Sequence, residues 1–232
     1  MRLADAKRWI LDLIFLRSCV GCGSEGELLC ASCRGGIAFE SPRCPVCGHR
    51  DLGGLVCDHC GEQNGLRRFF APFPYRHPLV RKLLHTYKYT GVRDLSPILA
   101  GEMHQFLNWY GIAVPPSALL LPVPLHPARE RERGFNQSAL LARELARQLG
   151  VEVCYALRRT RNTLPQAGMT DNARRRENMA GAFAVTNPDA VRGKTVVLVD
   201  DVSTSGATLA SAAFALRSAE ARTVWAMVLA KG

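Results

Sequence analysis

The sequence of 232 residues predicts an α/β fold, in which a mostly parallel sheet with flanking helices follows a small cysteine-rich module. Three observations lead to this prediction. Apolar runs alternate with helical patterns through residues 69–232, cysteines repeat in pairs within residues 19–60, and one apolar run ends in two adjacent carboxylates before a glycine-bearing turn. We therefore expect a module over residues 1–68 and a second domain over residues 69–232.

The chain begins with "MRLADAKRWILDLIFLRS", which has the apolar spacing of an amphipathic helix. Asp5 and Asp12 interrupt it and no small-residue cleavage site precedes Cys19, so its likeness to a signal peptide is weak. We expect a helix that docks on the protein, with a helix on a membrane surface as the alternative. No apolar run in the sequence reaches the length of a membrane span, so we expect none.

Eight of the nine cysteines form four Cys-x-x-Cys pairs, a spacing typical of tetrahedral zinc sites because one turn presents two thiolates to one ion. The simplest grouping is sequential, and an interleaved grouping stays open. Four protein ligands per ion leave no open position, so we expect two structural zinc ions; reduced thiolates indicate a cytoplasmic protein. The predicted ligands are Cys19, Cys22, Cys30, Cys33, Cys44, Cys47, Cys57 and Cys60.

Polar and glycine-bearing residues 61–68 predict a linker to the second domain. Amphipathic spacing predicts three helices there, namely one that starts at Pro78, one over residues 95–111 and one within residues 134–150. Apolar runs predict strands at residues 119–122, 151–160, 182–185, 194–200 and 222–232. The alternation of strands with helices predicts the parallel sheet.

The stretch "TVVLVDDVSTSGATLASAAFALR", residues 195–217, indicates function most directly. Residues 196–199 are continuously apolar, as in a central strand buried on both faces, and ligands of such sheets bind at the carboxyl ends of the strands. Asp200 and Asp201 stand at that end. Gly206, the hydroxyl residues around it and the N-terminus of the next helix then form an anion site. Such a site suits a sugar phosphate whose hydroxyls bind the acids, and the acid pair can recruit magnesium.

The segment "VVLVDDVSTSGAT" resembles the 5-phosphoribosyl-1-pyrophosphate (PRPP) signature of type I phosphoribosyltransferases. The resemblance implies the fold of that class. It also implies that Asp200 and Asp201 hold the ribose hydroxyls, while residues 203–208, which we call the phosphate loop, wrap the 5′-phosphate. The loop consists of Ser203, Thr204, Ser205, Gly206, Ala207 and Thr208.

A second resemblance covers nearly the whole chain. The cysteine pairs, "PFPYRHPLVRKLLHTYKYTG", "LPVPLHPARERERGFNQ", "LPQAGMTDNARRRENMAGAF" and the PRPP signature together resemble the ComF/GntX family of competence-associated phosphoribosyltransferase-like proteins. This resemblance implies a mobile catalytic loop over residues 166–178. It also implies a pyrophosphate-binding loop with arginines beside it. The residues concerned are Arg174, Arg175 and Arg176 in the first loop, and Val123, Pro124, Leu125, His126, Arg129, Arg131 and Arg133 in the second region.

The assignment of the arginines has an alternative, because the run "RERER" is also the pattern of a solvated charged segment. Lys88 is a further candidate for phosphate binding. Transfer from PRPP needs positioning, neutralisation of the leaving group and exclusion of water, which arginines and magnesium supply.

The acceptor is unknown. Because the chain ends at its last predicted strand, we expect the acceptor-binding hood within residues 69–118.

The net charge of +10 is concentrated in the second domain, where residues 69–232 hold 21 Lys/Arg against 12 Asp/Glu, whereas residues 1–68 hold 9 against 8. This excess fits a polyphosphate ligand, and it also fits nucleic acid. Beside an enzyme that transfers phosphoribosyl groups in connection with DNA uptake, we therefore keep a non-catalytic alternative. That alternative is a factor that handles single-stranded DNA, or docks competence-machinery proteins, through the PRPP fold.

Overall fold

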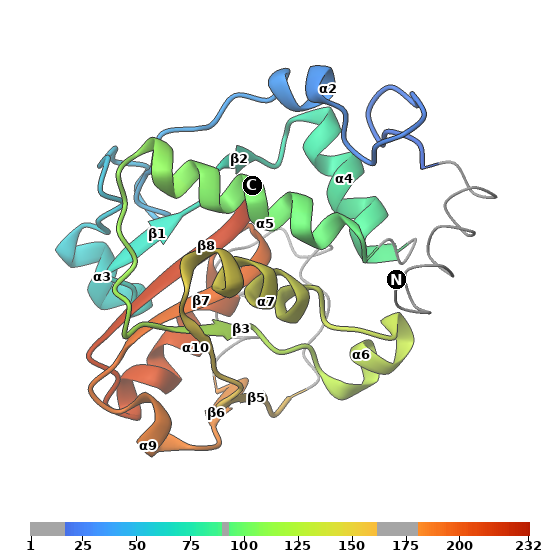
Figure 1. Ribbon diagram of the computed structural model, residues 1–232. Helices are drawn as coiled ribbons and strands as arrows, with labels where there is room; N and C mark the ends of the chain where they lie inside the picture. The colour runs from blue at the N-terminus through green and yellow to red at the C-terminus, as the bar shows by residue number, and fades with distance from the viewer. Residues whose placement is uncertain (1–16, 90–92, 162–180) are drawn as a thin grey trace.

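The computed structural model describes residues 17–89, 93–161 and 181–232, and the predicted N-terminal amphipathic helix lies almost wholly outside them. A six-stranded parallel sheet forms the centre of the molecule (Figure 1). Its strand order is β1-β8-β7-β3-β4, and β2 also pairs with β8. The strands are β1 Arg68–Phe70, β2 Phe73–Pro74, β3 Leu119–Pro122, β4 Glu152–Val153, β7 Thr195–Ser203 and β8 Thr223–Lys231.

The helices predicted from apolar spacing are confirmed. Asn136 caps α7 by accepting a hydrogen bond from the Ser138 N–H at 3.0 Å, and Gly150 ends the same helix in the left-handed conformation. The acidic and basic run after Pro127 forms a short helix rather than an open loop, and Gly134 ends it. The helices are α2 Ala31–Gly35, α3 Asp58–Asn64, α4 Pro78–Tyr89, α5 Leu95–Trp109, α6 Pro127–Arg133, α7 Gln137–Leu149, α9 Pro188–Val191 and α10 Ala207–Ser218.

Strand β7 separates two hydrophobic cores. Val197 and Val199 belong to the core formed with α4, α5 and α7, whereas Val196 and Leu198 belong to the core formed with α10. Successive side chains of a strand point to opposite faces of the sheet, so both faces of this strand are buried. This double burial explains the continuous apolar run in the sequence, and the prediction of a central parallel strand is confirmed.

The cysteine-rich module wraps round the molecule from α2, above α4, to α3 beside α10 (Figure 1). Leu29 and Ile37 join the core that contains α4 and α5, and Val56 and Leu66 join the core that contains α10. Arg34 of α2 also forms an ion pair with the buried Glu102 of α5. The module and the sheet therefore share both hydrophobic cores.

The segment predicted as a linker is folded into this arrangement. Helix α3 continues to Asn64, and β1 begins at Arg68. Between them, the Arg67 N–H donates to the Val224 carbonyl at 2.7 Å, which ties the segment to β8. The polar composition of residues 61–68 comes from an exposed helix surface and a left-handed cap at Gly65, and not from an open connection. The domain boundary at residue 68 stays a prediction.

The single strand predicted over residues 151–160 is wrong, because two short strands take its place. Glu152 and Val153 pair with β3 as β4, and β5 Leu157–Arg159 pairs antiparallel with β6 Phe183–Val185 in a separate two-stranded sheet. Strand β3 is four residues long and ends at Pro122, which has no N–H to offer a neighbour. Strand β4 therefore has little of β3 to pair with beyond Val153, and the chain leaves the sheet there.

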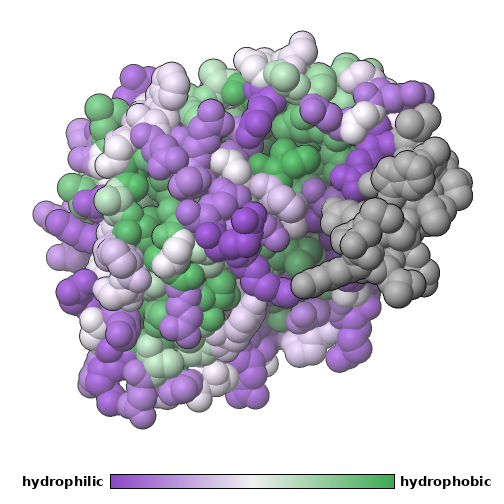
Figure 2. Space-filling view, viewed as in Figure 1, coloured by the Kyte–Doolittle hydropathy of each residue, from purple (hydrophilic) through white to green (hydrophobic). Residues whose placement is uncertain are grey.

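On the face viewed from α5 and α7, hydrophobic residues appear in several areas between hydrophilic ones (Figure 2). Among the residues that the structure describes, no helix is both long enough and apolar enough to cross a membrane.

Candidate functional site

A cavity of about 530 Å³ opens at the carboxyl ends of β3 and β7. This is the edge where ligands of parallel sheets bind, and the volume lies within the range of small-molecule sites. Helices α4, α6 and α7 supply most of the remaining wall. The lining residues are Tyr75, Leu84, His85, Lys88, Tyr89, Val123, Pro124, Leu125, Arg129, Arg133, Gln137, Ser138, Arg159, Asp200, Asp201, Val202, Thr204 and Thr208.

The two predicted acids lie together in this cavity and each has a partner. The Ser138 hydroxyl donates to Asp200 Oδ1 at 2.8 Å, and the Asp201 N–H donates to the same oxygen at 2.9 Å. Lys88 Nζ lies 2.9 Å from Asp201 Oδ1. The charge of one carboxylate is thus matched by a lysine, while the other carboxylate accepts only neutral donors among these contacts.

The pKa values of Asp200 and Lys88 reflect these surroundings. Burial, together with the charge of Asp201, raises the pKa of Asp200 to about 7, although the Ser138 hydroxyl and Lys88 oppose the shift. Burial lowers the pKa of Lys88, but the attraction of Asp201 outweighs it, and the pKa lies above its ordinary value. Near neutral pH the site therefore holds a charged lysine and an Asp200 that is partly protonated.

The phosphate loop connects β7 to α10. Gly206 has a φ of 76°, and a side chain there would meet only the Ser203 hydroxyl, at 4.0 Å, so the glycine leaves open space in front of the helix N-terminus. The buried Ser203 hydroxyl has no hydrogen-bond partner within the described part of the chain. Thr204 and Thr208 face the cavity. The loop thus offers hydroxyl and N–H donors to an anion, as expected from the sequence.

Helix α6 supplies the basic wall. Arg129 and Arg133 stand four residues apart, so they share one face of the helix, and both line the cavity. Arg131 is exposed and is not part of the lining. His126 does not line the cavity either: its Nδ1 accepts from the Ala128 N–H at 3.3 Å and caps α6. The backbone segment of Val123, Pro124 and Leu125 does line it.

Sequence reasoning missed three polar residues of the cavity. Arg159 lies on β5 with its guanidinium 5.7 Å from the centre of the Phe183 ring, and it is only 9% exposed. Gln137 is buried, and its side-chain nitrogen has no partner among the described residues. Ser138 holds Asp200. The motif "LPVPLHPARERERGFNQ" ends at Gln137 and could have pointed to it, whereas Arg159 depends on the short β5–β6 pairing.

An aromatic wall was also not assigned from the sequence. Tyr89 is 62% exposed and lies at the end of α4, where the His85 ring is 4.9 Å away and the Arg133 guanidinium lies 5.2 Å from the ring centre. Tyr75 lines the same cavity. These residues come from the segment 69–118, in which we expected the acceptor-binding hood. The catalytic loop expected at Arg174, Arg175 and Arg176 lies outside the described residues.

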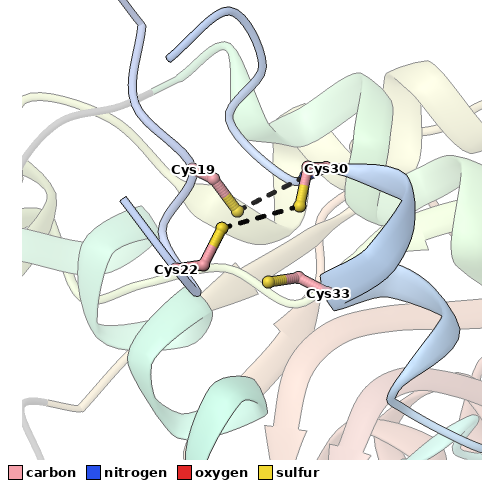
Figure 3. A group of neighbouring side chains, drawn as sticks. All are labelled: Cys19, Cys22, Cys30 and Cys33. Atoms are coloured by element: carbon pink, nitrogen blue, oxygen red, sulfur yellow. Dashed lines mark hydrogen bonds between the residues drawn. The ribbon is translucent and has the colours of Figure 1, made fainter. Parts of the chain in front are cut away.

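The eight paired cysteines form two clusters, with Cys19, Cys22, Cys30 and Cys33 in one and Cys44, Cys47, Cys57 and Cys60 in the other. In each cluster the sulfur atoms lie within 4.8 Å of one another. Figure 3 shows the four thiols of the first cluster pointing toward a common centre. The sequential grouping is therefore the one found.

The thiols of the first cluster differ in pKa: side-chain hydrogen bonds with Cys30 and Cys22 raise the pKa of Cys33 to about 12. Burial raises the pKa of Cys19, but N–H groups of Cys30, Cys22 and Gly21 outweigh it and bring the pKa to about 6. Four converging sulfur ligands without an open position are the donor set of a structural zinc site. Both clusters thus fit structural zinc.

The acid pair also fits a hard cation, since carboxylate oxygens are ligands that magnesium accepts. Lys88 already occupies one oxygen of Asp201, so few protein ligands remain for an ion. Magnesium typically binds through one or two carboxylates and the phosphates of its substrate, and this donor set matches that mode.

Comparison with known families agrees with this arrangement. The model described as "Phosphoribosyl transferase domain" matches residues 136–232, and that described as "Double zinc ribbon domain" matches residues 10–62. The fold and the paired-cysteine sites thus define a protein of the phosphoribosyltransferase class that carries a double zinc ribbon.

Curated relatives narrow the class further. The chain is 32% identical over 203 residues to the DNA utilization protein YhgH of Escherichia coli O157:H7, covering 84% of this chain and 87% of that one. It is 27% identical to competence protein F of Haemophilus influenzae, over 78% and 86% of the two chains, and 27% identical to competence protein ComFC of Bacillus subtilis, over 81% and 77%. The chain belongs to the ComF/GntX family.

A more distant likeness was found among solved structures. A solved structure described as the allosteric regulatory enzyme of purine biosynthesis aligns with 59% of this chain and 26% of its own, at 22% identity and a TM-score of 0.39.

Proposed function

We propose that this protein binds PRPP with magnesium in the cavity at the ends of β3 and β7, and that it transfers the phosphoribosyl group to an acceptor. One observation carries the proposal: the acid pair, Thr204 and Thr208 of the phosphate loop, and Arg129 and Arg133 of α6 line one cavity. A sugar that carries a phosphate at one end and a pyrophosphate at the other would use all of these groups.

Each wall has a role in the proposal. Asp200 and Asp201 accept hydrogen bonds from the ribose hydroxyls, and Lys88 stays paired with Asp201. The phosphate loop binds the 5′-phosphate through its N–H and hydroxyl donors. The backbone after β3, with the arginines of α6 and Arg159, receives the pyrophosphate. Arg174, Arg175 and Arg176 are proposed to close over the sugar.

The chemical step follows from these positions. The bond between ribose C1 and the pyrophosphate oxygen breaks, the leaving pyrophosphate keeps the electron pair, and the acceptor forms a bond to C1 and releases a proton. Arginine side chains stabilise the negative charge that develops on the leaving group. Bound magnesium would add Lewis-acid neutralisation of the same phosphates. No nucleophilic side chain is needed.

The aromatic wall supports a planar acceptor. PRPP itself has no flat apolar surface, whereas Tyr89 presents an exposed ring at the cavity and Tyr75 also lines it. Of the exposed large apolar side chains that the structure describes, Tyr89 is the one that lines this cavity. We therefore place the acceptor beside α4.

The test is release of pyrophosphate from PRPP and magnesium in the presence of single nucleobases and other planar acceptors. We expect one of them to stimulate release. Arg129→Gln should lower that rate, whereas the matched change Arg131→Gln, at an exposed position on the same helix, should leave it unchanged. If no acceptor stimulates release while PRPP still binds, the site is a binding site without transferase activity.

A second function rests on the relatives and on charge. Relatives named for DNA utilization and competence, together with the net charge of +10, support a role of this chain in DNA uptake as a factor that handles single-stranded DNA, with docking of competence-machinery proteins as an alternative. PRPP and single-stranded DNA are both polyanions, and both would bind the arginines of α6. We therefore expect PRPP with magnesium to compete with single-stranded DNA.

Competition is measured by the fluorescence anisotropy of labelled single-stranded DNA at fixed ionic strength. A fall in anisotropy on adding PRPP supports a shared site. Unchanged anisotropy at saturating PRPP would show that PRPP and DNA bind at separate sites. If the protein binds no DNA even at low salt, its positive charge serves only the binding of PRPP.

A further inference from the structure

The second cysteine cluster shares a small cavity and a hydrophobic core with the phosphate loop. Pro45 and Val46, the two residues between Cys44 and Cys47, line a cavity of about 20 Å³ together with Ser205, Gly206 and Ala207 of the loop; residues within 63–69 and the start of α10 complete the lining. A space of this size holds at most about one water molecule. We call residues 44–47 the second knuckle. It lies close to the phosphate loop, and Thr204 and Thr208 of that loop line the ligand site.

Lys231 joins the knuckle and the loop. In the sheet it stands opposite Ser203, and its Nζ donates to the Thr204 carbonyl at 2.6 Å. The same lysine lines a cavity of about 350 Å³ together with all four residues of the second knuckle. The start of the loop is therefore held by a side chain that also faces the knuckle.

The first cysteine cluster has a different neighbour. The Gly21 carbonyl accepts a hydrogen bond from Lys82 Nζ of α4 at 3.4 Å, and a Cβ on Gly21 would lie 3.3 Å from Leu79 Cδ1. Val20 packs against the core of α4 and α5, whereas Cys44 belongs to the core that also contains Ala207 and Leu209. The two clusters, alike in their ligands, thus support different parts of the molecule.

We propose that the second knuckle, with Lys231, positions the phosphate loop in its binding conformation, and that the first knuckle, residues 19–22, does not. The loop contains small residues and a glycine with positive φ, so its own side chains restrain it little. Packing from behind reduces the conformational freedom that an anion would otherwise have to remove on binding. Pro45 and Val46 are therefore positioning residues, and they do not touch the ligand. The inference rests on the proposed function only for the identity of the phosphate ligand.

The two knuckles offer a matched pair of substitutions outside the metal ligands. Val46→Gly removes the side chain behind the loop, and Val20→Gly makes the same change between the cysteines of the first knuckle. In the ligand-free full chain, Val46→Gly should speed amide hydrogen exchange of residues 203–208 about tenfold, and Val20→Gly should change it less than about twofold. The conservative change Val46→Ile should keep the exchange slow.

The affinity for PRPP with magnesium, measured by calorimetry, should follow the same order. We expect Val46→Gly to weaken it about tenfold and Val20→Gly to leave it within about twofold. Lys231→Met, which removes the hydrogen bond to Thr204, should act like Val46→Gly. Metal analysis of each variant should equal that of the wild type, which separates positioning from loss of zinc.

Equal exchange in the two valine variants, with zinc content unchanged, would overturn the proposal. If Val46→Gly fails to fold, the comparison of Lys231→Met with wild type decides: unchanged exchange at residues 203–208 would contradict the proposal in the same way. Hydrogen exchange is measured without ligand. If the wild-type protein binds no PRPP, the proposed function is wrong, but the exchange experiment still tests the positioning role of the second knuckle.

Discussion

Asp200 shows how one residue combines the requirements of the site. Its carboxylate lies in the second half of β7, which continues to Ser203; Asp200 is next to Asp201 and accepts a hydrogen bond from Ser138 at 2.8 Å. Burial and the adjacent charge raise its pKa to about 7. The folded-state pKa exceeds the unfolded value of about 3.9, so the free protein loses stability as the pH rises from about 4 through 7. A ligand that donates hydrogen bonds to the ionised acid recovers part of this loss.

Ser138→Ala tests that link. Removal of the hydroxyl takes away a hydrogen bond that favours the ionised form, so the pKa of Asp200 should rise further. We expect the affinity for PRPP to increase with pH in both proteins, with the midpoint at higher pH in the variant. Calorimetry across neutral pH measures this, and the titration of PRPP itself cancels in the comparison. Superimposable profiles would show that Asp200 does not titrate with binding.

A substitution of Arg159 tests a residue that was not predicted from the sequence. Its replacement by glutamine should weaken pyrophosphate binding by about tenfold or more, since a hydrogen bond to a charged group contributes about 1.5–3 kcal/mol. The neighbouring Arg158 is exposed on the opposite side of β5, so Arg158→Gln is the control. Equal affinity of both variants would remove Arg159 from the site.

At the scale of elements, the phosphate loop and α10 show what local sequence can predict. The apolar strand, the acid pair and the glycine turn follow from residues within one stretch of chain, because a buried strand and a helix N-terminus each leave a local pattern. The division of residues 151–160 into β4 and β5 depends instead on how far β3 extends and on a partner strand at residues 183–185, which local composition does not encode.

Gly206→Ala tests the loop as an element. A residue other than glycine in the left-handed region costs about 1–2 kcal/mol, and the new methyl group would also enter the open space of the anion site. Gly193 has a φ of 66°, and a methyl group there would meet no other atom within 4 Å, so Gly193→Ala imposes the same strain away from the loop. Both variants should lose similar thermal stability, and only Gly206→Ala should lose PRPP affinity, measured by calorimetry. Equal affinities would contradict an anion site at this turn.

At the scale of the whole molecule, the cysteine module and the sheet are built as one packing unit. Leu29 and Val56 lie in two different cores, both of which contain residues of the central sheet. The sequence predicted the module correctly from cysteine spacing, which metal geometry determines locally. Its attachment to α5 through Arg34 and Glu102, 68 residues apart, leaves no such pattern.

We expect about two zinc ions per chain, bound by the two clusters. Elemental analysis of protein purified without chelator measures this number. Since the module shares both cores, chelation should lower the melting temperature of the entire molecule in a single transition. Disulfides without metal would contradict the zinc sites, and a separate early transition of the module would contradict the shared packing.

The acid pair and the phosphate loop are proposed to form a PRPP site. Calorimetric titration of PRPP with magnesium into the wild type and into the Asp200→Asn, Asp201→Asn double variant tests it most directly. We expect binding to the wild type and none to the variant, and a melting transition that stays cooperative shows that the variant is folded, even where loss of the Lys88–Asp201 ion pair lowers its melting temperature. Equal affinity of the two proteins, or no binding by the wild type, would contradict it.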